Sequence, residues 1–537
     1  YFEGLIRKYL LEPEHASLFI MKPEAGLTGK REQELKEKLA AYKASLTAEQ
    51  LAEIKRKQEG LQAYQDEPET KETLEKLPLL QRSDLKKEAM PLIAKKSEWA
   101  GIHVVSEEVF TNGIAYLKLN FDVHEVPVAK LPYLGLLVTA LGYMDSDHYT
   151  QRELDNEVNI ETGGIFTGLE TFVKYKDANY YRPTCYFTIK VMYDKIGKAF
   201  ELVEEMMHHT KLDDLTRLKE IILETKSKKQ MELNGAGHSV AVRRALSYQS
   251  QKSYYADLVE GIAYYRFLAD LAEHVDERVA EVATELKQLC AILFRKENLI
   301  AGVTAEAEGL AVVEKELAKV AEFIPGTSIA GDIRFRAAEF NFQLEKKQEA
   351  FTCSGQVQYV AKCGNFLETG VSYGGALDVA NNILSMSYFW DKVRVHGGAY
   401  GCMSNFGLDG AYTLVSYRDP NLTETLDIFD HAWEYLRDFD VDEREMTKMI
   451  IGTLSNTDAP LTPRSLGARS FNHYMAGTTF EELQKARDER LAATPADIRA
   501  CAELYHQAIA QDCMCVVGSE AKIEANKELF GSIESLL

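Results

Sequence analysis

The sequence predicts an α+β protein in which a helical hairpin precedes a doubled α+β unit. Three observations support this prediction. The chain has 537 residues, which is too long for one hydrophobic core. A charged, helix-rich segment comes first, and mixed strand and helix patterns follow from about residue 95. The second half of the mixed region repeats the order of the first, which is typical of a doubled α+β unit.

The N-terminal part divides into two predicted segments. Residues 16–22 are predicted to form a strand that ends at Pro23. Between about 28 and 85 the chain is rich in strong helix formers and nearly free of β-branched residues, which predicts a helical hairpin that connects other domains. A T-x-x-Q capping box at Thr47 starts its second helix. A free coiled coil is the alternative, but the heptad pattern in this segment is not sustained long enough for one.

The mixed region contains two matching series of elements, expected to form domains at 95–325 and 326–537. In the first series, strands are predicted at 113–123, 180–193 and 297–305, and helices at 132–144, 196–210 and about 213–292. In the second, strands are predicted at 356–366, 409–419 and 512–519, and helices at 373–395 and 422–439. Each series also contains a helix, a Gly-Gly pair and a strand that opens with an aromatic residue.

These Gly-Gly pairs are predicted to be structural corners. A phosphate-binding loop follows a strand and opens a helix, so that helix N–H groups face the anion. In "VRVHGGAYG" (393–401) the order is reversed. A glycine just past a helix end supplies the left-handed backbone conformation that a side chain resists. Gly397 and Gly398 are therefore assigned a structural role.

The duplication also provides an internal comparison. Superposing "VNIETGGIFTG" on "VRVHGGAYG" places Ile160 opposite Arg394 and Phe166 opposite Tyr400. A guanidinium and a phenol therefore replace two apolar groups in the second copy. This difference suggests a pair presented toward a shared space. An ordinary surface arginine and a core tyrosine remain the alternative.

No catalytic centre is apparent in the sequence. Neither H-x-x-E-H nor H-E-x-x-H occurs. The nearest approach is a helix with Glu204, Glu205, His208 and His209, but without a third ligand it is interpreted as a polar helix end. His274 and His431 each stand alone on a helix and are expected to be surface or satisfied core residues.

Composition excludes several classes of function. The formal charge of −21 argues against a protein that binds nucleic-acid phosphates. It would suit a chamber that attracts cationic ligands, although a solvated acidic surface is the preferred interpretation. No apolar run is long enough for a membrane helix. The N-terminus lacks a signal-peptide layout and does not begin with Met. Eight cysteines suggest a reducing compartment, with Cys513 and Cys515 on one face of a buried strand.

The corner sequence resembles a known family. "WDKVRVHGGAYG" (390–401), "LVSYRDPNLTETLDIFD" (414–430) and "QVQYVAKCGNF" (356–366) resemble the last domain of the presequence-protease branch of the pitrilysin and insulin-degrading-enzyme family. The resemblance implies four homologous α+β domains in two halves that close around a peptide-degrading chamber. The inverted H-x-x-E-H zinc motif of this family lies in its first domain. The present chain resembles the second half. By this resemblance, residues 1–27 would be the tail of a preceding domain, with its last strand, and 28–94 the helical-hairpin hinge. Residues 95–325 and 326–537 would be the third and fourth domains, two homologous α/β-sandwich domains.

The resemblance implies a role for the corner side chains. Arg394 and Tyr400 would bind the peptide, with His396 as a weaker candidate, and Tyr400 would stabilise the transition state. A phenol can stabilise charge developing on a carbonyl oxygen, and a guanidinium can hold substrate carbonyls. The full-length enzyme would be a zinc metallopeptidase. This chain alone would bind no catalytic zinc and would be inactive.

The expected partners are the N-terminal half of the same peptidase and short unstructured peptides, with no nucleic acid and no membrane. A bacterial cytoplasm is the expected location, with an organelle matrix as the alternative. A separately encoded partner subunit or a peptide-binding scaffold of the same fold is the competing functional prediction.

Overall fold

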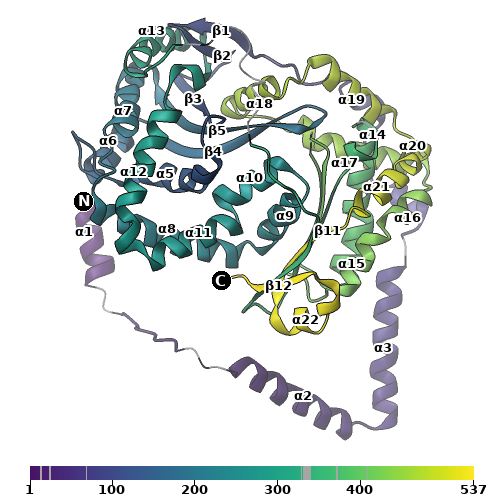
Figure 1. Ribbon diagram of the computed structural model, residues 1–537. Coiled ribbons are helices and arrows are strands. Elements are labelled where there is room, and N and C mark those ends of the chain that lie inside the picture. Colours follow the sequence, from purple (N-terminus) through teal and green to yellow (C-terminus); the bar gives the residue numbers. More distant parts are fainter. Residues whose placement is uncertain are drawn as a thin grey trace. The chain divides into compact units, whose positions relative to one another are not determined.

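The computed structural model (Figure 1) describes residues 1–537 apart from 13–14, 23, 25, 68, 328, 330–339, 371–372 and 408. It divides into two compact units, Tyr1–Leu79 and Leu80–Leu537. Among the described residues, no helix combines the length and the apolar character needed to cross a membrane.

The smaller unit is helical. Its helices are α1 (Phe2–Ile6), a short π-helix (Arg7–Leu11), α2 (Leu27–Ser45), α3 (Ala48–Asp66) and α4 (Lys71–Glu75). The predicted capping box is confirmed: Gln50 N donates to Thr47 Oγ1 at 3.2 Å, and Thr47 N donates to Gln50 Oε1 at 2.9 Å. The hinge role of α2 and α3 stays a prediction.

The prediction of a strand at 16–22 is wrong. These residues are exposed and belong to no strand. A strand needs a neighbour to accept and donate its backbone hydrogen bonds, and the described residues of the smaller unit provide none. Pro23, expected to end that strand, lies outside the described residues.

The larger unit begins with a six-stranded sheet in the order β1-β2-β6-β3-β5-β4. Its strands are β1 (Lys95–Trp99), β2 (Ile102–Glu108), β3 (Ile114–Asp122), β4 (Ile165–Lys174), β5 (Asp177–Met192) and β6 (Leu299–Ala305). Its helices are α5 (Leu131–Tyr143), α6 (Gln151–Glu161), α7 (Ile196–His208), α8 (Leu215–Gly235), α9 (Gly237–Ser247), α10 (Gln251–Glu260), α11 (Ile262–Glu273), α12 (Val275–Leu293) and α13 (Ala307–Phe323).

A second six-stranded sheet follows in the order β12-β7-β11-β8-β10-β9. Its strands are β7 (Gln348–Cys353), β8 (Tyr359–Asn365), β9 (Gly401–Phe406), β10 (Ala411–Tyr417), β11 (Cys513–Ser519) and β12 (Ser532–Ser535). Its helices are α14 (Gly375–Ile383), a π-helix (Leu384–His396), α15 (Thr423–Asp430), α16 (Ala432–Arg437), α17 (Glu443–Asp458), α18 (Pro463–Ala476), α19 (Phe480–Ala492), α20 (Pro495–Ala500), α21 (Ala502–Ile509) and α22 (Glu520–Glu524).

The two sheets confirm the predicted duplication. Apart from the edge strand, both have the same order along the chain, and the first strand of each lies parallel to the last (β2 with β6, β7 with β11). The other equivalent pairs are antiparallel in both sheets. The copies differ at the edge, where β1 is antiparallel to β2 but β12 is parallel to β7.

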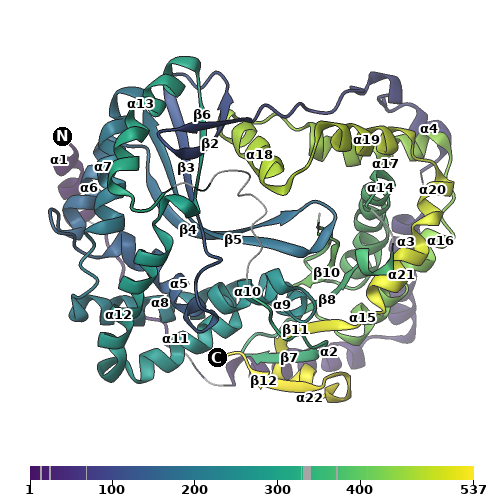
Figure 2. The same cartoon turned by 45° about the horizontal axis from the view of Figure 1, so that its top comes forward.

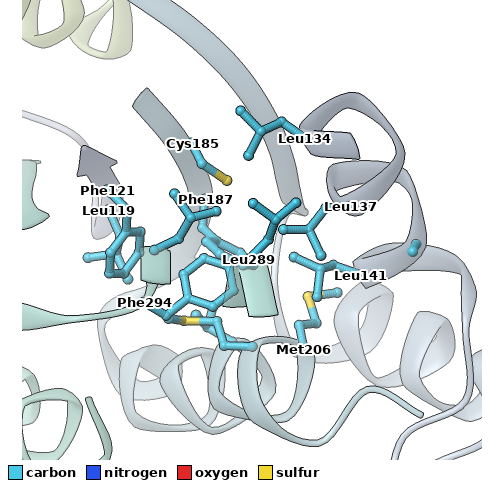
Figure 3. Close-up of a cluster of buried hydrophobic side chains, with 14 of the residues drawn as sticks. Leu119, Phe121, Leu134, Leu137, Leu141, Cys185, Phe187, Met206, Leu289 and Phe294 are labelled. Carbon is cyan, nitrogen blue, oxygen red and sulfur yellow. The ribbon is translucent and has the colours of Figure 1, made fainter. Parts of the chain in front are cut away.

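The first and second halves of the larger unit are the parts that contain the first and the second sheet. The core of the first half lies between its sheet and the helices α5, α7 and α12. Figure 3 shows side chains from β3 and β5 facing Leu134, Leu137 and Leu289 from the helices. The Phe121 and Phe294 rings pack edge to face with their centroids 5.1 Å apart. Each such buried side chain contributes on the order of 1.5–3 kcal/mol to folding.

The two halves of the larger unit cover each other's sheets (Figure 2). Helix α18 of the second half packs Phe471 and Met475 on the first sheet, where Phe471 meets Phe172 at a centroid distance of 5.9 Å. Helix α9 of the first half packs on the second sheet, against a face that includes Cys513 and Cys515. The prediction that these two cysteines share one buried strand face is therefore confirmed.

A polar network reinforces this contact between the halves. Arg244 on α9 donates to Glu349 on β7 at 2.7 Å and to Asp257 at 2.8 Å. Tyr248 OH also donates to Glu349, at 2.6 Å. Because the buried carboxylate of Glu349 has charged and neutral donors from the other half, separating the halves would leave it unpaired at a high cost.

Candidate functional site

The second Gly-Gly corner ends an unusual helix. The helix that starts as α14 continues as a π-helix through residues 384–396, and Gly397 N bonds to Lys392 O, five residues back, at 3.0 Å. Gly398 has φ of +79°, in the left-handed region that favours glycine. A Cβ at Gly397 would lie 2.5 Å from Val393 O. π-Helical turns are rare and frequently occur at functional sites.

The first corner has the equivalent arrangement. Helix α6 ends before Gly163 and Gly164, and β4 follows. Gly164 also has a positive φ, of +122°. Phe166 is 63% exposed on this corner, and Tyr400 is 68% exposed on the other. The two aromatic positions are therefore equally open, and they differ by the phenol hydroxyl.

Tyr400 is presented from the corner into open space. Its backbone N donates to Tyr417 O at 3.0 Å, and its ring meets the Tyr417 ring edge to face at 5.8 Å. Among the described residues its hydroxyl has no hydrogen-bond partner. The alternative of a core tyrosine is therefore wrong, because the ring is exposed and held only at its base.

Arg394 lies on the last turn of the π-helix. Its guanidinium carbon is 4.0 Å from the centroid of the Trp390 ring, a cation–π contact. Within the described part of the chain Arg394 forms no ion pair, so its donors remain available. His396 pairs its Nε2 with Asp391 Oδ1 at 3.1 Å, across the five-residue spacing that a π-helix aligns.

Aromatic groups continue from Tyr400 across the second sheet. The Tyr417 ring is 5.8 Å from Tyr359 and 4.8 Å from His238, which comes from α9 of the other half. The sequence analysis missed Trp390, Tyr417 and His238. The four-residue spacing of Trp390 and Arg394 in the sequence could have indicated that their side chains are in contact. No local pattern could have predicted that His238 lies against the second sheet.

The first corner borders a cavity of about 170 Å³ between the first sheet and α18. Its lining includes Phe166, Lys190, Arg464 and Phe471. Glu107 also lines it, with 1% of its surface exposed. Burial raises the pKa of Glu107 to about 8, against a smaller opposing effect of the Thr304 hydroxyl, which donates to Glu107 at 3.0 Å. The sequence analysis gave no sign of this carboxyl group.

The sequence analysis also considered histidines outside the glycine corner. His274 and His431 are exposed, and the Nδ1 of each bonds to a backbone carbonyl of its own helix, as expected for surface residues. No third ligand was apparent in the sequence for the helix end with Glu205 and His209, but the structure brings a third group with a possible ligand atom to it. His148, 57 residues from Glu205 along the chain, lies beside both residues.

Comparisons with known proteins place this architecture in a family. Residues 21–271 match the associated region of peptidase family M16, subfamily C, and residues 348–520 match the "PreP C-terminal domain". The fold resembles the crystal structure of the inactive domain of an M16 peptidase from Pseudomonas fluorescens, with a TM-score of 0.55, 15% identity and coverage of 79% of this chain and 98% of that one. A conserved protein from Enterococcus faecalis gives a TM-score of 0.58 at 15% identity, over 80% of this chain and 99% of that one.

Sequence relatives cover the whole chain. It is 37% identical to "Protein HypA" from Clostridium perfringens over 100% of this chain and 54% of that protein. It is 30% identical to "Presequence protease 1, chloroplastic/mitochondrial" from Arabidopsis thaliana over 98% of this chain and 48% of that protein. The chain thus spans about half the length of these curated relatives.

The fold is of the class seen in the inactive domain of M16 peptidases. Within that class, the chain belongs to the presequence-protease family and corresponds to its C-terminal region.

Proposed function

We propose that this chain is the C-terminal half of a zinc-dependent peptidase that degrades short unstructured peptides in a closed chamber. It supplies Arg394 and Tyr400 to the substrate and leaves the zinc ligands to the N-terminal half. One observation carries this proposal: the exposed phenol of Tyr400 and the partly exposed guanidinium of Arg394 flank a glycine corner whose duplicate carries only Ile160 and Phe166 at these positions.

The chemistry of the two side chains suits this role. When a water molecule attacks a peptide carbonyl, negative charge develops on the carbonyl oxygen, and a phenol O–H can stabilise it. The free N–H groups of Arg394 can hold neighbouring carbonyls of the peptide. Arg394 lies in the last turn of the π-helix that ends at the glycine corner, and Tyr400 follows the corner, so one bend of the backbone places both groups.

The zinc ligands would come from another part of the enzyme. The sequence contains neither of the zinc-binding motifs H-x-x-E-H and H-E-x-x-H. In the assembled enzyme, zinc would activate the attacking water and polarise the carbonyl. The corner would position the peptide and stabilise its oxyanion.

Mixing this chain with the N-terminal half tests the proposal. We expect each half alone to be inactive toward a fluorogenic peptide and the mixture to cleave it, with activity abolished by a chelator and restored by zinc. A stable but inactive mixture that still binds the peptide would support the competing prediction of a peptide-binding scaffold.

A further inference from the structure

A cluster of two histidines and one glutamate lies where the α5–α6 loop meets the C-terminal end of α7. His148 belongs to the loop, Glu205 to the last turn of α7, and His209 follows that helix. One possible ligand atom from each residue lies within 4.8 Å of the other two. The Glu205 side chain is buried, and that of His148 is 67% exposed, which leaves a path for an ion to enter.

The backbone holds these two segments together. Ser146 and Thr210 form an antiparallel β-bridge, and Asp147 N donates to His209 O at 3.0 Å. Because these bonds join the two chain segments directly, His148 and His209 do not depend on long, mobile side chains to meet. The cluster is organised before any ligand binds.

Hydrogen bonds also orient the side chains. His148 Nδ1 lies 2.9 Å from Glu205 Oε2, and His148 N donates to Glu205 Oε1 at 2.9 Å. Asp147 Oδ2 lies 3.1 Å from His209 Nδ1 and fixes the orientation of that ring. A carboxylate behind a histidine is a common second layer around metal ligands, where it sets the tautomer and strengthens the ligand.

We propose that His148, Glu205 and His209 bind a divalent transition-metal ion of the zinc class. Imidazole nitrogen with one carboxylate is a ligand set that zinc takes, whereas magnesium and calcium prefer all-oxygen ligands. Tetrahedral zinc ligands about 2.1 Å from the ion lie roughly 3.4 Å apart, so the His148–Glu205 pair needs only a small opening. The ion takes the place of the hydrogen between His148 Nδ1 and Glu205 Oε2: a protonated imidazole releases this proton to solvent, whereas a neutral imidazole keeps it on Nε2.

Such an ion would clamp the α5–α6 loop to the end of α7. Helix α6 leads directly into the first Gly-Gly corner, so the clamp would steady the chain that enters this corner. The proposal does not depend on the peptidase function, because it concerns binding by this chain alone.

Calorimetric titration of the tag-free, chelator-treated chain with zinc chloride tests the proposal. We expect one ion per chain and a rise in Tm on binding. His148→Ala should weaken binding at least about tenfold without loss of folding, because this side chain is largely exposed. His431→Ala is the matched control: His431 is exposed and pairs with Asp427 at 3.3 Å, and its loss should leave zinc affinity unchanged.

Cobalt provides a second readout. The Co²⁺-loaded chain should show visible absorption without a thiolate charge-transfer band, which separates this site from the eight free cysteines. Absence of stoichiometric binding, a thiolate band, or equal zinc affinity in His148→Ala and the unaltered chain would each overturn the proposal.

Discussion

The guanidinium of Arg394 lies over the indole ring of Trp390, with 4.0 Å between the guanidinium carbon and the ring centroid. The two residues are four apart on the π-helix that ends at the glycine corner. The contact anchors the guanidinium, and its N–H donors form no ion pair with the residues that the structure describes, so they can serve a ligand.

Trp390→Ala should therefore weaken peptide binding in the recombined enzyme. An exposed cation–π contact is worth about 0.5–1 kcal/mol, so KM should rise roughly two- to fivefold with kcat little changed. Steady-state kinetics on a fluorogenic peptide measure this split. Met386→Ala, an exposed change on the same π-helix, is the control and should leave both constants unaltered. A lower kcat at unchanged KM would contradict a purely orienting role for Trp390.

Gly398→Ala should destabilise the larger unit through its backbone. The added methyl group would meet only Pro420, at 3.6 Å, so the cost comes from φ of +79° and amounts to about 1–2 kcal/mol. Urea unfolding measures the change. Gly142→Ala near the end of α5 meets no atom within 4 Å and is the control, expected to be neutral or slightly stabilising. If the two substitutions change the free energy of unfolding equally, the positive φ at Gly398 does not disfavour alanine and the prediction is contradicted.

Glu107 should make stability fall as pH rises. Its pKa is about 8 in the folded chain and near its ordinary value of 4.5 when unfolded, so between these values the folded state binds more protons. The free energy of unfolding should therefore decrease from about pH 5 to pH 8, by at most about 1.4 kcal/mol per pH unit. Urea unfolding at several pH values measures the slope.

Glu107→Gln should remove this part of the slope, because glutamine does not titrate. Glu108→Gln is the matched control: Glu108 is the next residue on β2, its side chain is half exposed, and it pairs only with exposed Lys95. Identical pH slopes in the unaltered chain and in Glu107→Gln would contradict the burial argument.

The acidic charge gives a prediction about substrates. A formal charge of −21 should favour basic peptides over acidic peptides of equal length, through long-range attraction. The kcat/KM value for the basic peptide, divided by that for the acidic peptide, should fall in the recombined enzyme as salt rises from about 50 to about 500 mM. The reason is that the Debye screening length shortens from about 10 Å at 0.1 M to about 3 Å at 1 M, so that long-range attraction is lost. A ratio that does not change with salt would show that the charge is only a solvated surface.

Local sequence patterns predicted most of the elements, because alternation and helix formers act over short distances. Strand β3 and helix α5 lie within a residue or two of their predicted bounds. The strand expected at 16–22 failed for the complementary reason: its pattern is local, but the pairing that creates a strand is not. The helix expected at 422–439 is interrupted at His431, a break that its apolar pattern did not reveal.

The candidate site divides in the same way. Arg394 and Tyr400 were found because the duplicated corner offered a comparison inside one sequence. His148 was missed because it is 57 residues from Glu205 and joins it only through the fold. Glu107 shows no sequence signal either, since its raised pKa arises from burial between a sheet and a helix of the other half.

The cleavage rate of Tyr400→Phe in the recombined enzyme tests the central claim most directly. This change gives the second corner the aromatic group of the first and removes one hydroxyl from an exposed ring, so folding should be unaffected. If the phenol stabilises the oxyanion, kcat should fall about 10²–10³-fold, as for the loss of one oxyanion donor, with little change in KM. A kcat within twofold of the unaltered enzyme would contradict the claim.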